Sequence, residues 1–164
     1  MSTSMERIEL AGFWRRVVAG VADFLFFAAT SYSILFFLFG AEYFSWLSTH
    51  RGMLDIYAWP EPVITQLLPL LITVAMWVLF GATPGKFLVG CRVVDAQTLL
   101  PPSTRQALLR YVSYFLSLLP LGLGFLWIAF DKRKQGFHDK IAGTLVILEN
   151  EQRKSLDELE REAL

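Results

Sequence analysis

The sequence predicts an all-α membrane protein with two full transmembrane helices and a third helical segment that is broken or re-entrant. Three long apolar runs, at 17–40, 62–80 and 111–130, carry this prediction. The composition agrees with it, because 54% of the 164 residues are hydrophobic and only 18% are charged. The β-branched stretches 89–94 and 144–148 predict in addition a small cytoplasmic β-ribbon.

The first apolar run extends from Val17 to Gly40 and carries a charge at its entrance and another inside it. It is long enough to cross a bilayer core of roughly 30 Å at about 1.5 Å per residue. Arg16 precedes the run and Asp23 lies within it. A carboxylate inside such a segment costs about 2.5–3.5 kcal/mol on insertion scales. We therefore expect Asp23 to belong to a buried polar site.

The spacing of Arg16 and Asp23 argues against a direct bond between them. Both side chains lie on nearly the same face of a helix, but their Cα atoms are separated by roughly 10 Å along its axis. We expect Asp23 to pair with a water, a bridging residue or a group from another segment. Two interpretations stay open: a structural contact that locks helix packing, and a transport-related site.

The stretch GFWRRVVAGVAD at 12–23 resembles the opening of the RDD family of small membrane proteins. The family is named for one arginine and two aspartates, with the arginine at the start of the first helix and the first aspartate within it. The resemblance assigns these positions to Arg16 and Asp23, with Arg15 as a competitor for the first.

Residues 41–61 predict a loop on the outer side of the membrane, because they contain a single Lys or Arg. The second span follows from Pro62 to Phe80, and Pro69 inside it predicts a kink. Gln66 lies about one turn before this proline. We expect its amide either to bond a carbonyl that the kink frees or to join the site of Asp23.

The turn Thr83-Pro84-Gly85-Lys86 follows the second span and also matches the RDD pattern. It is not a phosphate-binding loop, because the G-x-x-x-x-G-K-[ST] spacing fails. Ser103 and Gln106 then form a capping box that begins a helix. Basic residues, Arg110 among them, place this part of the chain on the cytoplasmic side.

The third apolar run has basic residues at both ends and the breaker LPLGLG, residues 119–124, in its middle. One solution is a kinked span that violates the positive-inside rule. The other is a re-entrant pair of half-helices, roughly 104–119 and 121–130, that returns to the cytoplasm. We favour the re-entrant pair, because irregular backbone at membrane depth survives only against protein or a wet cavity.

The segment DKRKQGFHDKIAGT at 131–144 is closely similar to the second signature of the RDD family. The resemblance assigns the second family aspartate to Asp139. One interpretation is that His138 and Asp139 cap a short helix at 140–143. The other is that they form a titrating pair, since histidine changes charge near neutral pH and an adjacent carboxylate shifts it.

The resemblance covers residues 12–148 and implies transport, with cation/proton antiport proposed for some family members. On this hypothesis the protein is a transporter or ion-conducting protein. Asp23 binds a monovalent cation or proton, Arg16 sets its pKa, and Asp139 with His138 acts as a gate or a relay at the cytoplasmic face. The supporting residues are Arg15, Gln66, Thr83, Gly85, Lys86, Arg110 and Asp131.

The alternative hypothesis is a non-catalytic accessory or assembly protein in which the arginine and the two aspartates form a structural network. Both hypotheses expect a membrane domain at 1–148, a charged cytoplasmic tail at 149–164, and a bacterial inner membrane with the N-terminus inside. Both also expect the lipid bilayer and either further copies of the chain or another membrane protein as partners. We expect no enzymatic activity, cofactor, metal site or nucleic-acid partner, since no motif for these is present.

Overall fold

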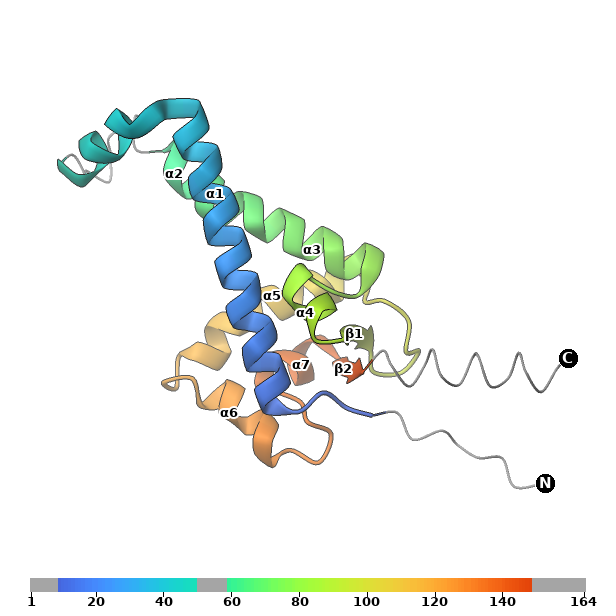
Figure 1. The fold of residues 1–164 in the computed structure, drawn as a ribbon. Helices are drawn as coiled ribbons and strands as arrows, with labels where there is room; N and C mark the ends of the chain where they lie inside the picture. The colour runs from blue at the N-terminus through green and yellow to red at the C-terminus, as the bar shows by residue number, and fades with distance from the viewer. Residues whose placement is uncertain (1–8, 50–58, 149–164) are drawn as a thin grey trace, which may run out of the picture.

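The computed structural model describes residues 9–49 and 59–148, and Figure 1 shows their arrangement. Two long helical segments extend from an assembly of short helices and a two-stranded sheet. Both segments are long and apolar enough to cross a membrane, as predicted. The tail at 149–164 and residues 50–58 of the predicted outer loop, with His50, lie outside the described residues.

The first helix, α1 (Phe13–Thr49), extends beyond the predicted span at both ends. Gly40 interrupts its helical geometry with a φ of +73°, which glycine adopts without steric cost. The expected loop from residue 41 was wrong as far as residue 49, because the chain resumes a helix after this glycine. The break at Gly40 itself coincides with the predicted end of the span.

The second span contains three helical pieces: α2 (Pro60–Pro62), a π-helical turn η2 (Val63–Leu67) and α3 (Leu68–Phe80). The Leu68 amide bonds the Val63 carbonyl in the wider π register. In that register the Ile64 carbonyl would need the amide of Pro69, which proline lacks. The Ser31 hydroxyl of α1 donates to this carbonyl instead, at 3.0 Å.

The third apolar run forms two helices, α5 (Thr104–Leu118) and α6 (Leu123–Phe130), bent by 100° at the predicted breaker. The predicted capping box of Ser103 and Gln106 begins α5. The strand β1 (Cys91–Asp95) precedes the pair and β2 (Thr144–Leu148) follows it, and the two strands pair antiparallel. Because one sheet holds both flanks, the structure supports a pair that returns to the side it entered.

The small sheet joins the three regions that the sequence placed on one side of the membrane. The Ala11 amide donates to the Val146 carbonyl, and the Leu148 amide donates to the Glu9 carbonyl, each at 2.9 Å. The N-terminal residues therefore extend the sheet next to β2. The predicted ribbon is confirmed, and the core that it shares with the helices includes Ala11, Trp77, Val93, Ala107 and Val146.

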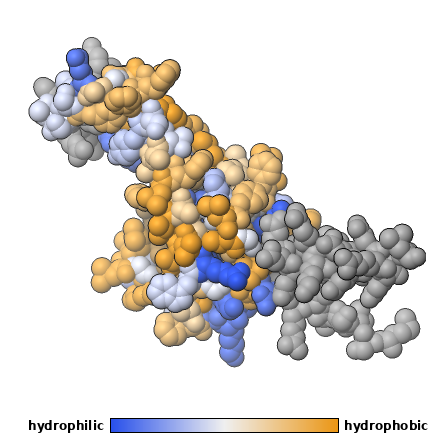
Figure 2. All heavy atoms as spheres, viewed as in Figure 1, coloured by the Kyte–Doolittle hydropathy of each residue, from blue (hydrophilic) through white to orange (hydrophobic). Residues whose placement is uncertain are grey.

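Two short helices pack against the longer ones at this end of the molecule. Helix α4 (Pro84–Leu88) contacts α1, and α7 (Phe137–Ala142) contacts α5. Figure 2 shows apolar side chains over much of the visible face of the long helices. This exposed apolar surface is what a chain surrounded by lipid requires.

Candidate polar site

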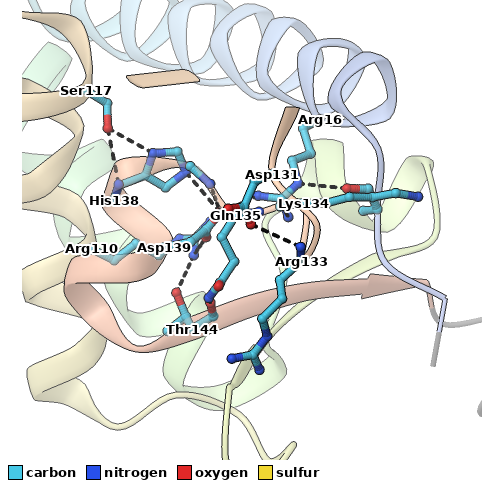
Figure 3. A network of polar contacts seen from close by, with 12 residues as sticks. Arg16, Arg110, Ser117, Asp131, Arg133, Lys134, Gln135, His138, Asp139 and Thr144 are labelled. Carbon is cyan, nitrogen blue, oxygen red and sulfur yellow. Dashed lines mark hydrogen bonds and ion pairs between the residues drawn. The ribbon is translucent and has the colours of Figure 1, made fainter. Parts of the chain in front are cut away.

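Asp139 is a fully buried carboxylate held between two arginines from different helices (Figure 3). Arg16, near the start of α1, places Nη1 2.5 Å from Oδ2 of Asp139. Arg110 of α5 contacts Oδ1 of the same carboxylate and donates to the Thr144 hydroxyl at 2.6 Å. The three charges therefore connect α1, α5, α7 and β2.

Asp139 also accepts the backbone N–H of Gly136 at 2.9 Å, so it satisfies a free amide at the start of α7. Burial raises the pKa of the Asp139 carboxyl, but the charges of Arg110 and Arg16 hold it well below its usual range. The aspartate is thus ionised at neutral pH. Of the two interpretations of this aspartate, the geometry favours the structural cap.

His138 lies beside Asp139 but is surrounded by rings and a hydroxyl. Its ring packs against Tyr114 and Phe125, with centroids 4.6 and 5.0 Å away. Its Nδ1 lies 3.1 Å from the Ser117 hydroxyl. Burial lowers the pKa of His138 to about 3, because the attraction of the Asp139 charge only partly offsets it. The imidazole is therefore neutral near pH 7.

Asp23 pairs with groups from the turn after the second span, as the spacing from Arg16 predicted. Its Oδ2 accepts the Thr83 hydroxyl at 2.5 Å and lies 3.6 Å from Nζ of Lys86. Its Oδ1 accepts the backbone N–H of Gly85 at 2.7 Å. The two family aspartates therefore have similar partners. Each accepts a backbone N–H at the start of a short helix, Asp23 from Gly85 and Asp139 from Gly136, and each lies beside at least one cationic side chain.

Gly85 is required where α4 meets α1, because its backbone approaches that helix closely. A Cβ atom at this position would overlap the Ala19 carbonyl oxygen and lie 2.8 Å from the Asp23 amide nitrogen. Only glycine leaves room for this contact. The small residues of the first motif and the glycine of the turn thus bring Asp23 to its partners.

The two polar groups border one cavity of about 520 Å³. Arg16, Asp23, Lys86, Arg110 and His138 supply its ionisable side chains. The remaining lining is largely apolar and aromatic: Phe24, Phe27, Trp77, Tyr111, Tyr114, Phe115, Leu118, Phe125 and Ile128. This volume lies within the range of small-molecule sites.

The other predicted supporting residues lie away from the cavity. Arg15 is exposed on α1, and Gln66 is exposed in η2, where Ser31 takes the role expected of it. Asp131 accepts the amide of Gln135 at 3.1 Å and pairs with Lys140 at 2.5 Å. It shapes the loop before α7.

Sequence reasoning missed several residues that complete the site. Trp77 is 1% exposed and stacks with both Lys86 and Arg110, 5.6 and 5.3 Å from its ring centroid. Thr144 and Ser117 supply the hydroxyls that bond Arg110 and His138. Thr144 ends the second family signature, whereas Trp77 and Ser117 stand in no recognisable motif, so only burial reveals these two.

Comparison with known proteins places this geometry in a family. The model described as the RDD family matches residues 10–143, which include both aspartates and all the arginines of the site. The chain belongs to the RDD family. The predicted resemblance is therefore confirmed over most of the sequence.

Two curated proteins are similar in sequence to this chain. The uncharacterized protein YxaI of Bacillus subtilis (strain 168) is 34% identical over 147 residues, which cover 84% of this chain and 96% of that protein. The uncharacterized protein RP437 of Rickettsia prowazekii (strain Madrid E) is 38% identical over 74 residues. That match covers 45% of this chain and 40% of the relative. No solved structure matches this chain.

Proposed function

We propose that this RDD-family membrane protein is a transporter or ion-conducting protein that exchanges a monovalent cation for a proton at Asp23. The observation that carries the proposal is the pairing of Asp23 with Lys86 inside the cavity, at 3.6 Å. Both side chains retain slight exposure, 14% and 11%. They are therefore reachable from the cavity, unlike Asp139, which is completely enclosed.

The chemistry follows from competition for one carboxylate. A monovalent cation that binds Asp23 displaces the ammonium group of Lys86 as its counter-charge. An unpaired ammonium in apolar surroundings favours its uncharged form, so the lysine then gives up a proton. One cation enters the site as one proton leaves it, and the charge of the site is unchanged. The reverse steps release the cation.

Asp139 has a structural role in this proposal in place of the gating role that the sequence suggested. Its ion pairs with Arg16 and Arg110 link α1 and α5 to α7 and thereby fix one wall of the cavity. Basic residues at the end of the molecule that holds the sheet support a location in a bacterial inner membrane with the N-terminus on the cytoplasmic side. Few spans also favour a homo-oligomer or a membrane-protein partner, and no enzymatic activity is proposed.

The accessory-protein hypothesis remains a second candidate, because the buried triad of Arg16, Asp139 and Arg110 is an interhelical network of the kind it requires. In this alternative, Asp23 clamps α4 to α1 through Gly85 and has no exchange role. The two hypotheses differ in what a neutral residue at position 23 does to flux and to stability.

The test is ion flux in proteoliposomes that contain the full chain. Collapse of an imposed pH gradient is followed after addition of Na⁺ or K⁺. We expect collapse with the wild type and none with Asp23→Asn or with Lys86→Gln, because the first variant lacks the cation-binding carboxylate and the second lacks the proton donor. Asp131→Asn and Lys132→Gln are the matched controls, since neither residue lines the cavity. Flux that persists in Asp23→Asn would overturn the exchange mechanism, and absence of flux in the wild type would favour the accessory role.

A further inference from the structure

The cavity has a mouth that faces the lipid. Three of its lining residues, Phe24 of α1 with Phe115 and Leu118 of α5, are 71%, 66% and 63% exposed on the outer surface. In a membrane protein such apolar side chains contact acyl chains. A molecule dissolved in the bilayer therefore reaches the cavity between α1 and α5 without crossing water.

The floor of the cavity carries an excess of positive charge. Arg16, Lys86 and Arg110 are cationic, and the two carboxylates near them are Asp23 and Asp139. One positive charge is left without a counter-charge among these groups. Uncompensated charge in apolar surroundings is costly, so a bound anion stabilises the site.

Two residues that line the cavity each have a hydrogen-bond donor without an acceptor. Nε of Arg110 and Nε1 of Trp77 are buried and have no hydrogen-bond partner among the described residues. Both side chains are 1% exposed, and the guanidinium carbon of Arg110 lies 5.3 Å from the Trp77 ring centroid. Buried donors of this kind normally have a partner, so a ligand that brought acceptor oxygens to Arg110 and Trp77 would satisfy two unpaired donors.

We propose that the cavity binds a single-chain amphiphile with a monoanionic head group, of which a fatty-acid carboxylate is the simplest case. The head group accepts hydrogen bonds from Arg110 and Trp77 and neutralises the excess charge. The acyl chain lies along the aromatic wall and leaves through the mouth between α1 and α5. This inference does not depend on cation exchange, because it uses different donors and involves no gradient.

The test is native mass spectrometry of the purified full-length protein, released from a neutral maltoside detergent with oleate or with methyl oleate. The wild type is expected to bind one oleate and to bind uncharged methyl oleate at least tenfold more weakly. Equal binding of the two compounds would overturn the proposal, because the cationic floor would then contribute nothing.

Gly20 offers a way to fill the cavity without disturbing the fold. It lines the cavity, and a Cβ atom there meets nothing within 4 Å. Gly20→Phe is expected to abolish oleate binding with an unchanged melting temperature. Val21→Phe is the matched control, because Val21 is 54% exposed and does not line the cavity. Wild-type oleate binding by Gly20→Phe would contradict the proposed location.

A second variant addresses the donors directly. Trp77→Phe retains an aromatic ring but removes the Nε1 donor. We expect oleate affinity to fall about tenfold to a hundredfold, as for the loss of one hydrogen bond to a charged group, with methyl oleate binding unchanged. An equal loss for both compounds would mean that only the shape of the pocket matters, and the head-group assignment would be wrong. Ion flux, measured separately, tests the exchange proposal independently of these results.

Discussion

Asp139 shows how this fold keeps charge in its interior. The carboxylate is completely buried, and it remains ionised because two guanidinium groups and a backbone N–H surround it. Pairs of this kind contribute little net stability when complete, but removal of one partner leaves charges uncompensated. Asp139 is therefore needed to offset the energetic cost of burying the charges of Arg16 and Arg110.

This dependence predicts the effect of Asp139→Asn. The variant leaves two guanidiniums without their shared counter-charge, so the free energy of unfolding should fall by about 3–5 kcal/mol. Denaturant unfolding in detergent micelles measures the change. Asp131→Asn is the control: its partner Lys140 is 44% exposed, and such pairs contribute less than about 1 kcal/mol. Equal losses in both variants would contradict the structural role of the triad.

His138 makes stability depend on pH. Its pKa is about 3 in the fold against 6.5 ordinarily, so the unfolded chain binds the proton first as pH falls. Stability is therefore complete above pH 6.5 and declines toward pH 3, by up to about 1.4 kcal/mol for each pH unit. Melting temperatures between pH 7.5 and 5 measure this slope before most carboxylates titrate.

We expect the change of melting temperature between pH 7.5 and 5 to be caused by His138. His138→Gln is expected to flatten the pH dependence in that window. His50→Gln is the matched control, since it removes the other of the chain's 2 histidines. A slope that survives in His138→Gln and disappears in His50→Gln would contradict the assignment.

The second span shows how a proline inside a membrane helix is accommodated by a neighbouring helix. Pro69 removes the amide that the Ile64 carbonyl would use, and the Ser31 hydroxyl of α1 replaces it. Ser31 is 4% exposed, so the bond is largely shielded. The π-helical turn and the packing of α1 against it are thus two results of the same proline.

Ser31→Ala should accordingly weaken the contact between the two spans. The Ile64 carbonyl would lose its donor, at a cost of about 0.6–2 kcal/mol. Thermal unfolding in micelles gives the difference, and Ser33→Ala, at an exposed position of the same helix, should leave the melting temperature unchanged. If the two variants behave alike, the hydroxyl does not stabilise the π-helical turn.

The whole molecule is organised by the sheet that joins residues far apart in the chain. Residues 9–11, β1 and β2 associate at one end, and α1 and the second span extend away from them. This association requires the bent pair α5 and α6 to return to its starting side. The exposed apolar side chains of the pair then lie in lipid without carrying the chain across.

Labelling of single cysteines checks this topology. In a Cys91→Ala background, Lys132→Cys and Gln97→Cys should react with an impermeant thiol reagent from the same side of the membrane. Trp59→Cys, at the far end of the second span, should react from the opposite side. Reaction of Lys132→Cys together with Trp59→Cys would show that the third apolar run crosses the bilayer.

Local features of the chain suffice to predict most of the elements. The lengths of the apolar runs predict the two spans, the box of Ser103 and Gln106 predicts the start of α5, and the breaker at 119–124 predicts the bend. The β-branched stretches predict the ribbon. These predictions hold because backbone preferences and periodicity act among residues a few positions apart.

The partners of the buried charges could not be found in this way. Arg16 bonds Asp139, 123 positions along the chain, although Asp23 is the nearer carboxylate in sequence. Asp23 bonds Thr83 and Gly85, and the cavity between the two groups exists only where α1, α3, α5 and α6 meet. Residues, motifs and helices are properties of the sequence, whereas the counter-charge of each ion depends on which helices pack together. Charges buried in packed helices are compensated by their nearest neighbours in space, and the folded chain alone determines which these are.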